Sequence, residues 1–497
     1  MPHSLHADRA ITRAPRRLAG ALGRLGRPLG LGLGLGLLGT GALAQAAPDR
    51  ACRWVWSPVE AVGRADSTWV DGSSRGMAQV AADRQGRVLV LWTEHDGAST
   101  GRILARRRVD GRWQPETELS SRTPRLAGSP PGLSLAMNPA GEAVAGWAWL
   151  AYDEGMRPQV NRFNPETGWQ RAHFMGNRQV FGEVTPTVAI NARGEAWAVW
   201  RQVEKATGIY AQTAPRGSGW QATARISESY TEQLPKLALA DDGLATVGWS
   251  LRGTQQTPVV ASFRPGEGWG PWQPLRDQRN MDSELEHLLM SPDGQVTALW
   301  EGLGVSDNPK HWTVMSRDLD PADGSLQPLQ ALNPDRGPWS RGLALAQGPT
   351  GRQAAFWTEL SWRADVIGAR LATRGGPGLA WQVQQVPLAR HWPAPTGATQ
   401  LSVGRQGQVT AAWSGQRRDT LAHGVSVVRL DAAGQLLGDD LLGPGVEPVL
   451  APLPAGRLLV VWRQLADPQD AAGPGTIVAR EGGPQCATAA TLLRGRR

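Results

Sequence analysis

The sequence predicts an all-β protein, an eight-bladed β-propeller of four-stranded antiparallel blades. Three observations support this prediction. One spacing of an aliphatic residue, a glycine and a tryptophan recurs eight times, and short strand-like runs follow the copies. Glycine, proline and tryptophan are abundant, with 61, 37 and 23 residues among 497. Repeats of about 50 residues that hold four short strands are typical of propeller blades.

The repeat keeps one register, in which a tryptophan follows a glycine by six residues and an aliphatic residue precedes that glycine by six. The glycine and tryptophan pairs are Gly86 and Trp92, Gly141 and Trp147, Gly194 and Trp200, Gly243 and Trp249, Gly294 and Trp300, Gly351 and Trp357, Gly407 and Trp413, and Gly456 and Trp462. Successive tryptophans lie 49 to 57 residues apart. This regularity predicts eight copies of one structural unit.

Each part of the repeat has a structural interpretation. The aliphatic run, as in residues 186–190, predicts a first strand, and the glycine supplies the positive φ of a tight turn. The run from glycine to tryptophan predicts a second strand that is apolar on both faces, with Val88 and Val90 on one and Leu89 and Leu91 on the other. Such a strand is buried between neighbouring sheets, so we expect the eight tryptophans in the core.

A third and a fourth strand complete the unit. Third strands are predicted at residues 102–106, 208–212, 366–370 and 476–480. The fourth strand tends to open with glycine and tryptophan, as at Gly168 and Gly268. Four antiparallel strands in each repeat match one propeller blade.

The two ends of the chain are predicted to share the last blade. The eighth unit supplies strands at residues 448–453, 457–462 and 475–481, and a spare copy of the fourth-strand pattern, residues 53–62, precedes the first unit. A ring of sheets loses its open edges only when its first and last strands meet. The N- and C-terminal strands are therefore expected to close the ring in the last blade.

The cysteines give an independent expectation. The chain has two, Cys52 just before the spare strand and Cys486 just after the last third strand. Ring closure brings these positions side by side, and an exported chain passes through an oxidising compartment, so a disulfide is expected. The alternative is two unrelated free thiols.

The N-terminal segment has the order of a secretory signal. Residues 1–27 carry six arginines and one acidic residue, and residues 28–44 form an uncharged run rich in leucine and glycine. Small residues then offer a cleavage site after Ala44 or Ala46. This order predicts an exported protein, located in the periplasm or outside the cell. The predicted domains are a signal peptide at 1–46, the propeller at 47–486 and a basic C-terminal tail at 487–497.

The net charge does not indicate a nucleic-acid partner once the signal is removed. The whole chain carries +8, and six arginines against one aspartate in residues 1–46 account for five of these charges. The remaining +3 is nearly balanced over a long chain, unlike the basic face of a nucleic-acid binder. No apolar span follows the signal. We expect a monomer without a membrane span, a cofactor or a metal site.

The blade pattern over residues 53–486 resembles the secreted bacterial β-propellers of the broad sialidase-like or BNR-type group. Sialidases carry Asp-boxes of the form S-x-D-x-G-x-T-W, whereas the nearest match here, residues 291–300, differs in spacing and lies in a first turn. The resemblance implies an arginine triad, a tyrosine nucleophile with a glutamate partner, and an aspartate acid. Tyr152 and Tyr230 are the loop candidates for the tyrosine, because Tyr210 lies in a predicted third strand; the triad is unassigned.

Any site is expected on the face where the loops from second to third strand and from blade to blade surround the central channel. Charged and polar residues follow the anchoring tryptophans there. The predicted ligand-binding residues are Glu94, Tyr152, Asp153, Glu154, Arg201, Glu301, Glu359 and Arg463. Converging carboxylates and arginines bind a sugar or small polar ligand, or act as an acid and base pair. The alternative is that these charges satisfy the ends of strands.

Two functions are predicted for this face of the propeller. The first is a binding or scaffold protein that recognises a protein or a glycan on its loops. The alternative is a sialidase-like hydrolase or lyase that acts on a glycan, with no catalytic residue assigned. A deep pocket with two carboxylates about 5–10 Å apart favours hydrolysis, whereas a shallow, wide or plugged mouth favours binding.

Alanine at Glu94, Glu301 or Glu359 is expected to weaken the activity of this face, because each substitution removes a carboxylate from the predicted site. Binding on a glycan array and turnover of a panel of fluorogenic glycosides measure the effect. Turnover that survives all three substitutions would contradict this choice of residues.

Overall fold

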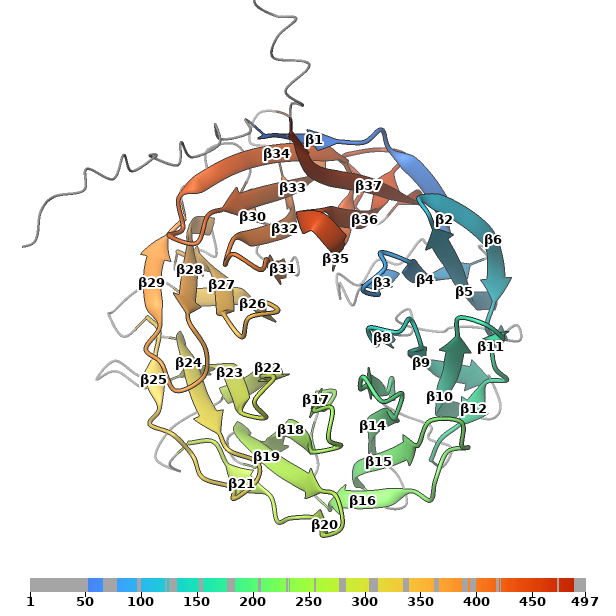
Figure 1. Cartoon of the computed structure of the whole chain (residues 1–497), viewed down its shortest axis with the longest axis vertical. Helices are drawn as coiled ribbons and strands as arrows, with labels where there is room; N and C mark the ends of the chain where they lie inside the picture. Colours follow the sequence, from blue (N-terminus) through green and yellow to red (C-terminus); the bar gives the residue numbers. More distant parts are fainter. Residues whose placement is uncertain are drawn as a thin grey trace, which may run out of the picture. The chain divides into compact units, whose positions relative to one another are not determined.

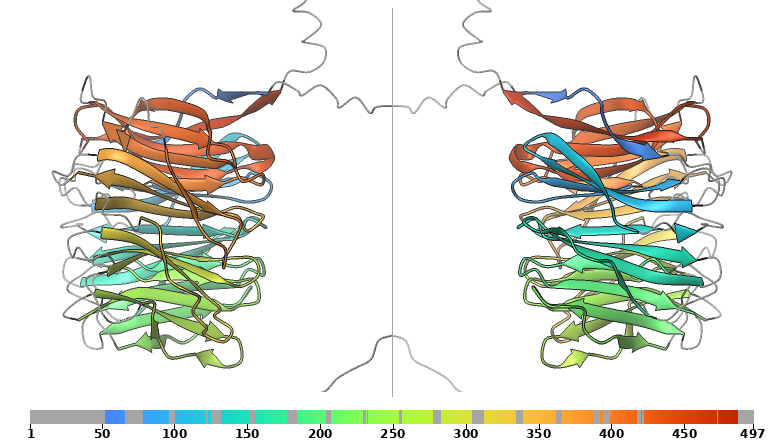
Figure 2. Two further views of the ribbon diagram at one scale, coloured as in Figure 1. Left: turned by 90° about the vertical axis from the view of Figure 1, so that its left-hand side faces the viewer. Right: turned by 90° about the vertical axis from the view of Figure 1, so that its right-hand side faces the viewer.

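The computed structural model shows a ring of eight antiparallel sheets around a common axis (Figure 1). The side views show strands that run across the thickness of the ring (Figure 2). The described residues are 52–65, 78–95, 100–120, 123–124, 132–151, 155–176, 184–203, 207–228, 231, 233–253, 256–276, 283–303, 312–333, 339–361, 366–386, 392–393, 399–416, 420, 422–471 and 473–486. The predicted signal peptide, 1–46, and the predicted tail, 487–497, lie outside them.

The chain forms the blades in order, and the first strand of each blade lies nearest the axis (Figure 1). Blades one to four are β3 (Ala78–Ala82), β4 (Val88–His95), β5 (Thr100–Val109), β6 (Arg112–Glu118) and β7 (Thr123–Pro124); β8 (Leu133–Met137), β9 (Ala143–Ala151), β10 (Gly155–Asn164), β11 (Gly168–Trp169) and β12 (His173–Phe174); β13 (Thr187–Ile190), β14 (Ala196–Gln202), β15 (Gly208–Ala214) and β16 (Ala224–Ser227); and β17 (Lys236–Leu239), β18 (Ala245–Arg252), β19 (Gln256–Arg264), β20 (Gly268–Trp269) and β21 (Gln273–Pro274).

Blades five to eight follow the same plan. They are β22 (Ser283–Met290), β23 (Val296–Leu303), β24 (Trp312–Leu319) and β25 (Gln330–Ala331); β26 (Trp339–Gln347), β27 (Gln353–Leu360), β28 (Val366–Arg374) and β29 (Gln382–Gln385); β30 (Trp392–Pro393), β31 (Gln400–Val403), β32 (Val409–Gln416), β33 (His423–Leu430) and β34 (Leu436–Pro444); and β35 (Val446–Pro452), β36 (Leu458–Leu465) and β37 (Gly475–Cys486) with β1 (Cys52–Trp56) and β2 (Glu60–Ala65). The predicted eight-bladed propeller is confirmed.

The repeated glycine and tryptophan have the structural roles expected from the sequence. All eight glycines adopt a positive φ, from 71° at Gly456 to 93° at Gly243, in the turn between first and second strands. All eight tryptophans are at most 1% exposed. A glycine tolerates this backbone conformation without strain, and each tryptophan buries a large apolar surface. The repeat therefore encodes one turn and one buried anchor for each blade.

The first strands of the chain complete the last blade, as predicted. Both β1 and β2 pair antiparallel with β37, which places Cys52 directly opposite Cys486. The two cysteines form a disulfide across 434 residues of sequence. The turn between β1 and β2 is also held, because the Ser57 N–H donates to the Glu481 carbonyl at 2.7 Å. Backbone pairing and a covalent bond thus close the ring together.

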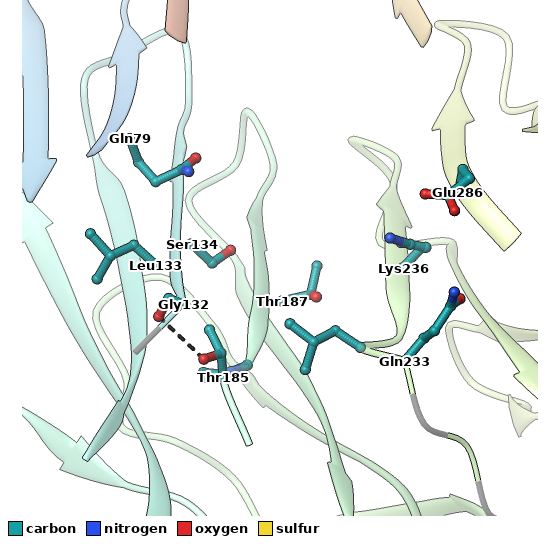
Figure 3. Close-up of a pocket in the computed structure, with 11 residues that line it drawn as sticks. Gln79, Gly132, Leu133, Ser134, Thr185, Thr187, Gln233, Lys236 and Glu286 are labelled. Atoms are coloured by element: carbon teal, nitrogen blue, oxygen red, sulfur yellow. Dashed lines mark hydrogen bonds between the residues drawn. The ribbon is translucent and has the colours of Figure 1, made fainter. Parts of the chain in front are cut away.

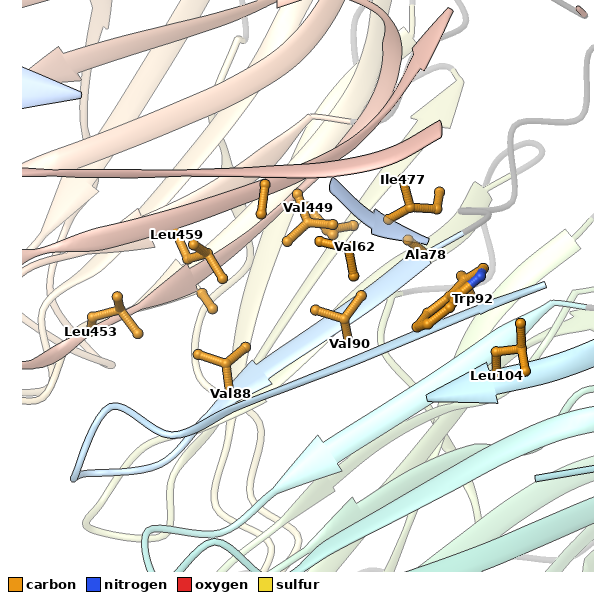
Figure 4. Close-up of a cluster of buried hydrophobic side chains, with 13 residues drawn as sticks. Val62, Ala78, Val88, Val90, Trp92, Leu104, Val449, Leu453, Leu459 and Ile477 are labelled. Carbon is orange, nitrogen blue, oxygen red and sulfur yellow. The ribbon is translucent and has the colours of Figure 1, made fainter. Parts of the chain in front are cut away.

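A buried hydrophobic cluster joins blade eight, which closes the ring, to blade one (Figure 4). Val62 of β2 and Val449 of β35 belong to the same buried cluster as Val90 and Trp92 of β4. The approach is close, because a Cβ added at Gly63 would overlap the Trp92 ring. The N-terminal strand β2 therefore packs against the buried tryptophan of the first blade.

Arginine side chains link neighbouring blades through buried hydrogen bonds. Arg374 of β28 donates to both carboxylate oxygens of Asp318 of β24, at 2.7 and 2.5 Å, and the two side chains are 0% and 1% exposed. Arg374 also donates to Thr297 and Gln353. Arg162 of blade two donates to three carbonyl groups of blade three. A guanidinium offers five donors in one plane and can satisfy several acceptors at once.

Helical structure contributes little to this part of the chain. Within the described ranges, one short 3₁₀ turn, Pro454–Gly456, interrupts the strands. No helix among the described residues is long and apolar enough to cross a membrane.

Replacing Cys52 or Cys486 with serine is expected to lower the free energy of unfolding by roughly 5 kcal/mol, because the disulfide limits the unfolded chain over a very long loop. Urea denaturation of the wild type and both variants measures the change. The double variant is the control and should match either single variant. Intact mass with and without reductant counts the thiols; two free thiols in the native protein would contradict the closure.

Candidate functional site

A pocket of about 380 Å³ lies against the inner strands of the first five blades (Figure 3). Its lining residues are Gln79, Gly132, Leu133, Ser134, Thr185, Pro186, Thr187, Gln233, Leu234, Lys236 and Glu286. Most stand at or just before the start of a first strand. First and second strands are antiparallel, with Ala78 opposite Trp92. The pocket therefore opens at the end of the ring where the second strands finish, which is the face predicted to carry a site.

Hydrogen bonds between blades fix the walls of this pocket. The Thr187 hydroxyl donates to the Pro235 carbonyl of the next blade at 2.6 Å, and the Ser134 hydroxyl accepts from the Val188 N–H at 3.1 Å. These bonds satisfy backbone groups on strand edges that no further strand covers. The same side chains therefore close the inner edges of the sheets and line the pocket.

The lining keeps a mixed set of free donors and acceptors. Ser134 retains its hydroxyl hydrogen, and Thr187 retains acceptor capacity on its oxygen. Gln233 accepts from Ser250 at 3.2 Å through its carbonyl oxygen, which leaves its amide N–H groups. Gln79 points toward the open space in Figure 3 and makes no hydrogen bond with the described residues. A ligand with both hydroxyl hydrogens and hydroxyl oxygens matches such a lining.

A β-bulge places a carboxylate in the pocket. On β22, Leu285 pairs with Trp300 and His287 pairs with the next residue, Leu299, so Glu286 has no partner on β23. The extra residue breaks the alternation of the strand and redirects the Glu286 side chain. Bulges recur next to functional sites because they re-aim single side chains in this way.

His287, the next residue, connects the bulge to blade six. Its Nε2 lies 2.9 Å from the Leu343 carbonyl oxygen, which fixes the ring between two inner strands. Burial lowers the pKa of His287 below its usual 6.5, the charge of Lys236 lowers it further, and the Leu343 bond and the charge of Glu286 oppose this. The imidazole is therefore neutral at neutral pH.

Two of the sequence-predicted residues form ion pairs within their own blades. Glu94 lies 2.7 Å from Arg102 of β5, and Glu359 lies 2.9 Å from Arg370 of β28. Burial by itself lowers the pKa of Arg102, but the hydrogen bond and charge of Glu94, with the charge of Glu118, raise it above the usual value. These pairs join the ends of second strands to third strands.

Three other predicted residues are held by the protein as well. Arg201 donates to the Thr231 carbonyl at 2.9 Å, and Arg463 donates to the Gly473 carbonyl at 2.6 Å. Burial lowers the pKa of Arg463. Glu301 is half-buried on β23 and also has interactions of its own. Each of these side chains is oriented by neighbours in the structure.

The five predicted residues that the structure describes do not line the pocket. The other three, Tyr152, Asp153 and Glu154, lie outside the described residues, as does Tyr230. Their role in ligand binding stays a prediction.

The pocket residues share a register position that sequence reasoning missed. The position is seven residues before the turn glycine of each blade, immediately before the aliphatic residue of the repeat. It is occupied by Gln79, Ser134, Thr187 and Lys236 in blades one to four. His287 occupies the same position in blade five. A polar residue at the start of an otherwise apolar strand was the available signal. Glu286 carried no such signal, because a bulge shifts the register.

Comparisons with known proteins identify no family. No protein-family model matches the chain, and no curated protein matches it. Solved structures similar to the chain include an ulvan lyase described as a new family of polysaccharide lyase, at 10% identity and a TM-score of 0.47 over 88% of this chain and 99% of the other. The NanB sialidase of Streptococcus pneumoniae gives 9%, 0.37, 86% and 93%. The α-L-arabinanase of Penicillium chrysogenum gives 11%, 0.38, 85% and 98%.

The described ranges contain no group of three or more His, Cys, Asp or Glu side chains that could hold a metal ion. What the described pocket offers is hydrogen bonding and charge from Lys236 and Glu286.

Replacing His287 with glutamine is expected to reduce the loss of stability in acid. The pKa of His287 is lowered in the folded protein, so the unfolded chain takes up a proton first as the pH falls below 6.5. The free energy of unfolding then falls by up to about 1.4 kcal/mol per pH unit until the folded pKa is reached. Urea denaturation from about pH 7 to about pH 5 measures both proteins. Equal slopes in the two proteins would contradict this assignment.

Proposed function

We propose that this protein is an exported propeller that binds a glycan at the pocket on the inner strands. The mixed donors and acceptors of the lining carry this proposal, because sugar hydroxyls donate and accept at once. The pocket volume of about 380 Å³ lies in the range of small-ligand sites. Leu133, Pro186 and Leu234 add apolar surface for the C–H face of a sugar ring.

The rigidity of the walls supports binding at this place. Thr187 and Ser134 are held by bonds between blades, so their orientation is set before a ligand arrives. Preorganised groups lose little conformational entropy on binding. A glycan, which forms many weak hydrogen bonds, gains from a lining that needs no reordering.

Export is the second part of the proposal. The disulfide between Cys52 and Cys486 supports it, because disulfides persist in oxidising compartments outside the cytosol. The signal sequence predicted at residues 1–46 agrees with this location. Cell fractionation would distinguish a periplasmic protein from an extracellular one.

We further propose that the residues predicted from the sequence extend the site outward. Glu94 follows Trp92 at the end of β4, and this end lies beside the start of β3, where Gln79 stands. Glu301 and Glu359 hold similar places on β23 and β27. A longer glycan that leaves the pocket would pass the ends of the second strands.

A glycan-active hydrolase or lyase is the alternative function. Retaining and inverting hydrolysis both use two carboxyl groups about 5–10 Å apart. A panel of fluorogenic glycosides distinguishes this alternative from binding without turnover.

Replacing Gln79 with alanine is expected to weaken glycan binding by about threefold to tenfold, the effect of one neutral hydrogen bond. The fold should be unaffected, because the Gln79 amide bonds to no described residue. A glycan array identifies the ligand and calorimetry measures the dissociation constant. Gln382→Ala on the exposed outer strand β29 is the control. Equal affinities for the two variants would contradict binding at this pocket.

A further inference from the structure

We propose that the pocket selects a sugar with a primary amine, and that Glu286 is the residue that recognises it. This inference rests on the proposed function, since it names the ligand class of the same pocket. It follows from the place of one carboxylate, from the charges around it and from the hydrogen-bonding groups beside it.

The carboxylate of Glu286 is available to a ligand. Glu286 lines the pocket, is half-buried, and forms no hydrogen bond or ion pair with the described residues. This is unusual among the described carboxylates near it in sequence, since Glu284 and Glu301, paired across β22 and β23, both have interactions within the protein. A half-desolvated carboxylate accepts strong hydrogen bonds from an ammonium group.

The bulge gives this carboxylate a specific position. In regular alternation the side chain before His287 would point into one of the two blade interfaces, where the inner strands bury apolar residues. The extra residue releases Glu286 from that pattern. Figure 3 shows its carboxylate on the side of the pocket across from Gln79. The carboxylate and the amide therefore approach a bound ring from opposite sides.

Two basic side chains lie near Glu286, Lys236 in the same lining and His287 next to it in the sequence. Lys236, also in the lining, makes interactions of its own within the protein. His287 is neutral, because burial lowers its pKa, and its Nε2 is engaged by the Leu343 carbonyl. Glu286 is therefore the charged lining group whose hydrogen-bonding capacity is unused among the described residues.

The remaining lining favours a sugar as the carrier of the amine. The free amide of Gln79, the hydroxyl hydrogen of Ser134 and the amide N–H groups of Gln233 are matched by ring oxygens and hydroxyls. A simple alkyl amine would leave these groups without partners in the bound state, which costs affinity. An amino sugar satisfies the carboxylate and the neutral groups together.

Calorimetry with two matched ligands tests the proposal. The probes are oligosaccharides of glucosamine and the same oligosaccharides fully N-acetylated, at a mildly acidic pH that keeps the free amine protonated. The wild type is expected to bind the amine form roughly tenfold to a hundredfold more tightly, the effect of one charge-assisted hydrogen bond. The isosteric Glu286→Gln variant should lose this preference and keep its affinity for the acetylated form.

Two controls separate charge in the pocket from charge elsewhere. Glu267→Gln removes a carboxylate from a turn of blade four, where the side chain is 72% exposed and 3.6 Å from Arg264. This variant should keep the preference for the amine. Lys236→Met should keep or increase it, because a positive charge leaves the lining.

The outcomes for the two proposals differ. Binding of both oligosaccharides with equal affinity, or a preference that survives Glu286→Gln, would overturn the role of Glu286 while glycan binding stands. Tighter binding of the acetylated form would also overturn it. Absence of binding to any glycan on the array, with Gln79→Ala unchanged from wild type, would overturn the proposed function itself.

Discussion

The pairing of β1 and β2 with β37 closes the ring and holds blade one against blade eight. Val62 and Gly63 of β2 pack on Trp92. The strand that completes blade eight therefore also contacts the buried tryptophan of blade one. The pocket spans blades one to five, which means that the distance from Gln79 to Glu286 is set by the ring as a whole. Without closure, both ends would be open edges and blade one would lose its neighbour.

Arginine side chains add polar links between neighbouring blades, as at the interfaces of blades two and three and of blades five and six. The pair Arg374 and Asp318 is fully buried and each partner has further hydrogen bonds, which is the condition under which a buried ion pair is tolerated. The chain has 52 basic residues, of which only Lys205, Lys236 and Lys310 are lysine. Planar, multiple donors suit this linking role better than a single ammonium group.

The fold was predictable because its sequence signals are periodic. The site could not be predicted in the same way, because the residues that form it depart from that period. The register of glycine and tryptophan predicted the turns, the buried anchors and the blade count. The spare N-terminal strand and the positions of the two cysteines predicted the disulfide from Cys52 to Cys486. The search for a site followed the variable loops after each tryptophan. It therefore passed over Gln79 on a first strand, and it had no means to locate Glu286, since a bulge is a local change of hydrogen-bond pairing.

A ring of equal blades also needs a source of asymmetry before it can orient a ligand. The position seven residues before each turn glycine supplies it. Its occupants, in blade order, are Gln79, Ser134, Thr187, Lys236, His287, Ala344, Gln400 and Val449. Polar side chains thus gather on the inner strands of five successive blades, whereas blades six and eight present alanine and valine there. The bulge in blade five then adds one carboxylate at the border of the polar arc. Neutral groups occupy one side of the pocket, and Lys236 and Glu286 occupy the other. The proposed amino sugar would therefore bind with its amine beside Glu286 and its hydroxyl groups toward the neutral side.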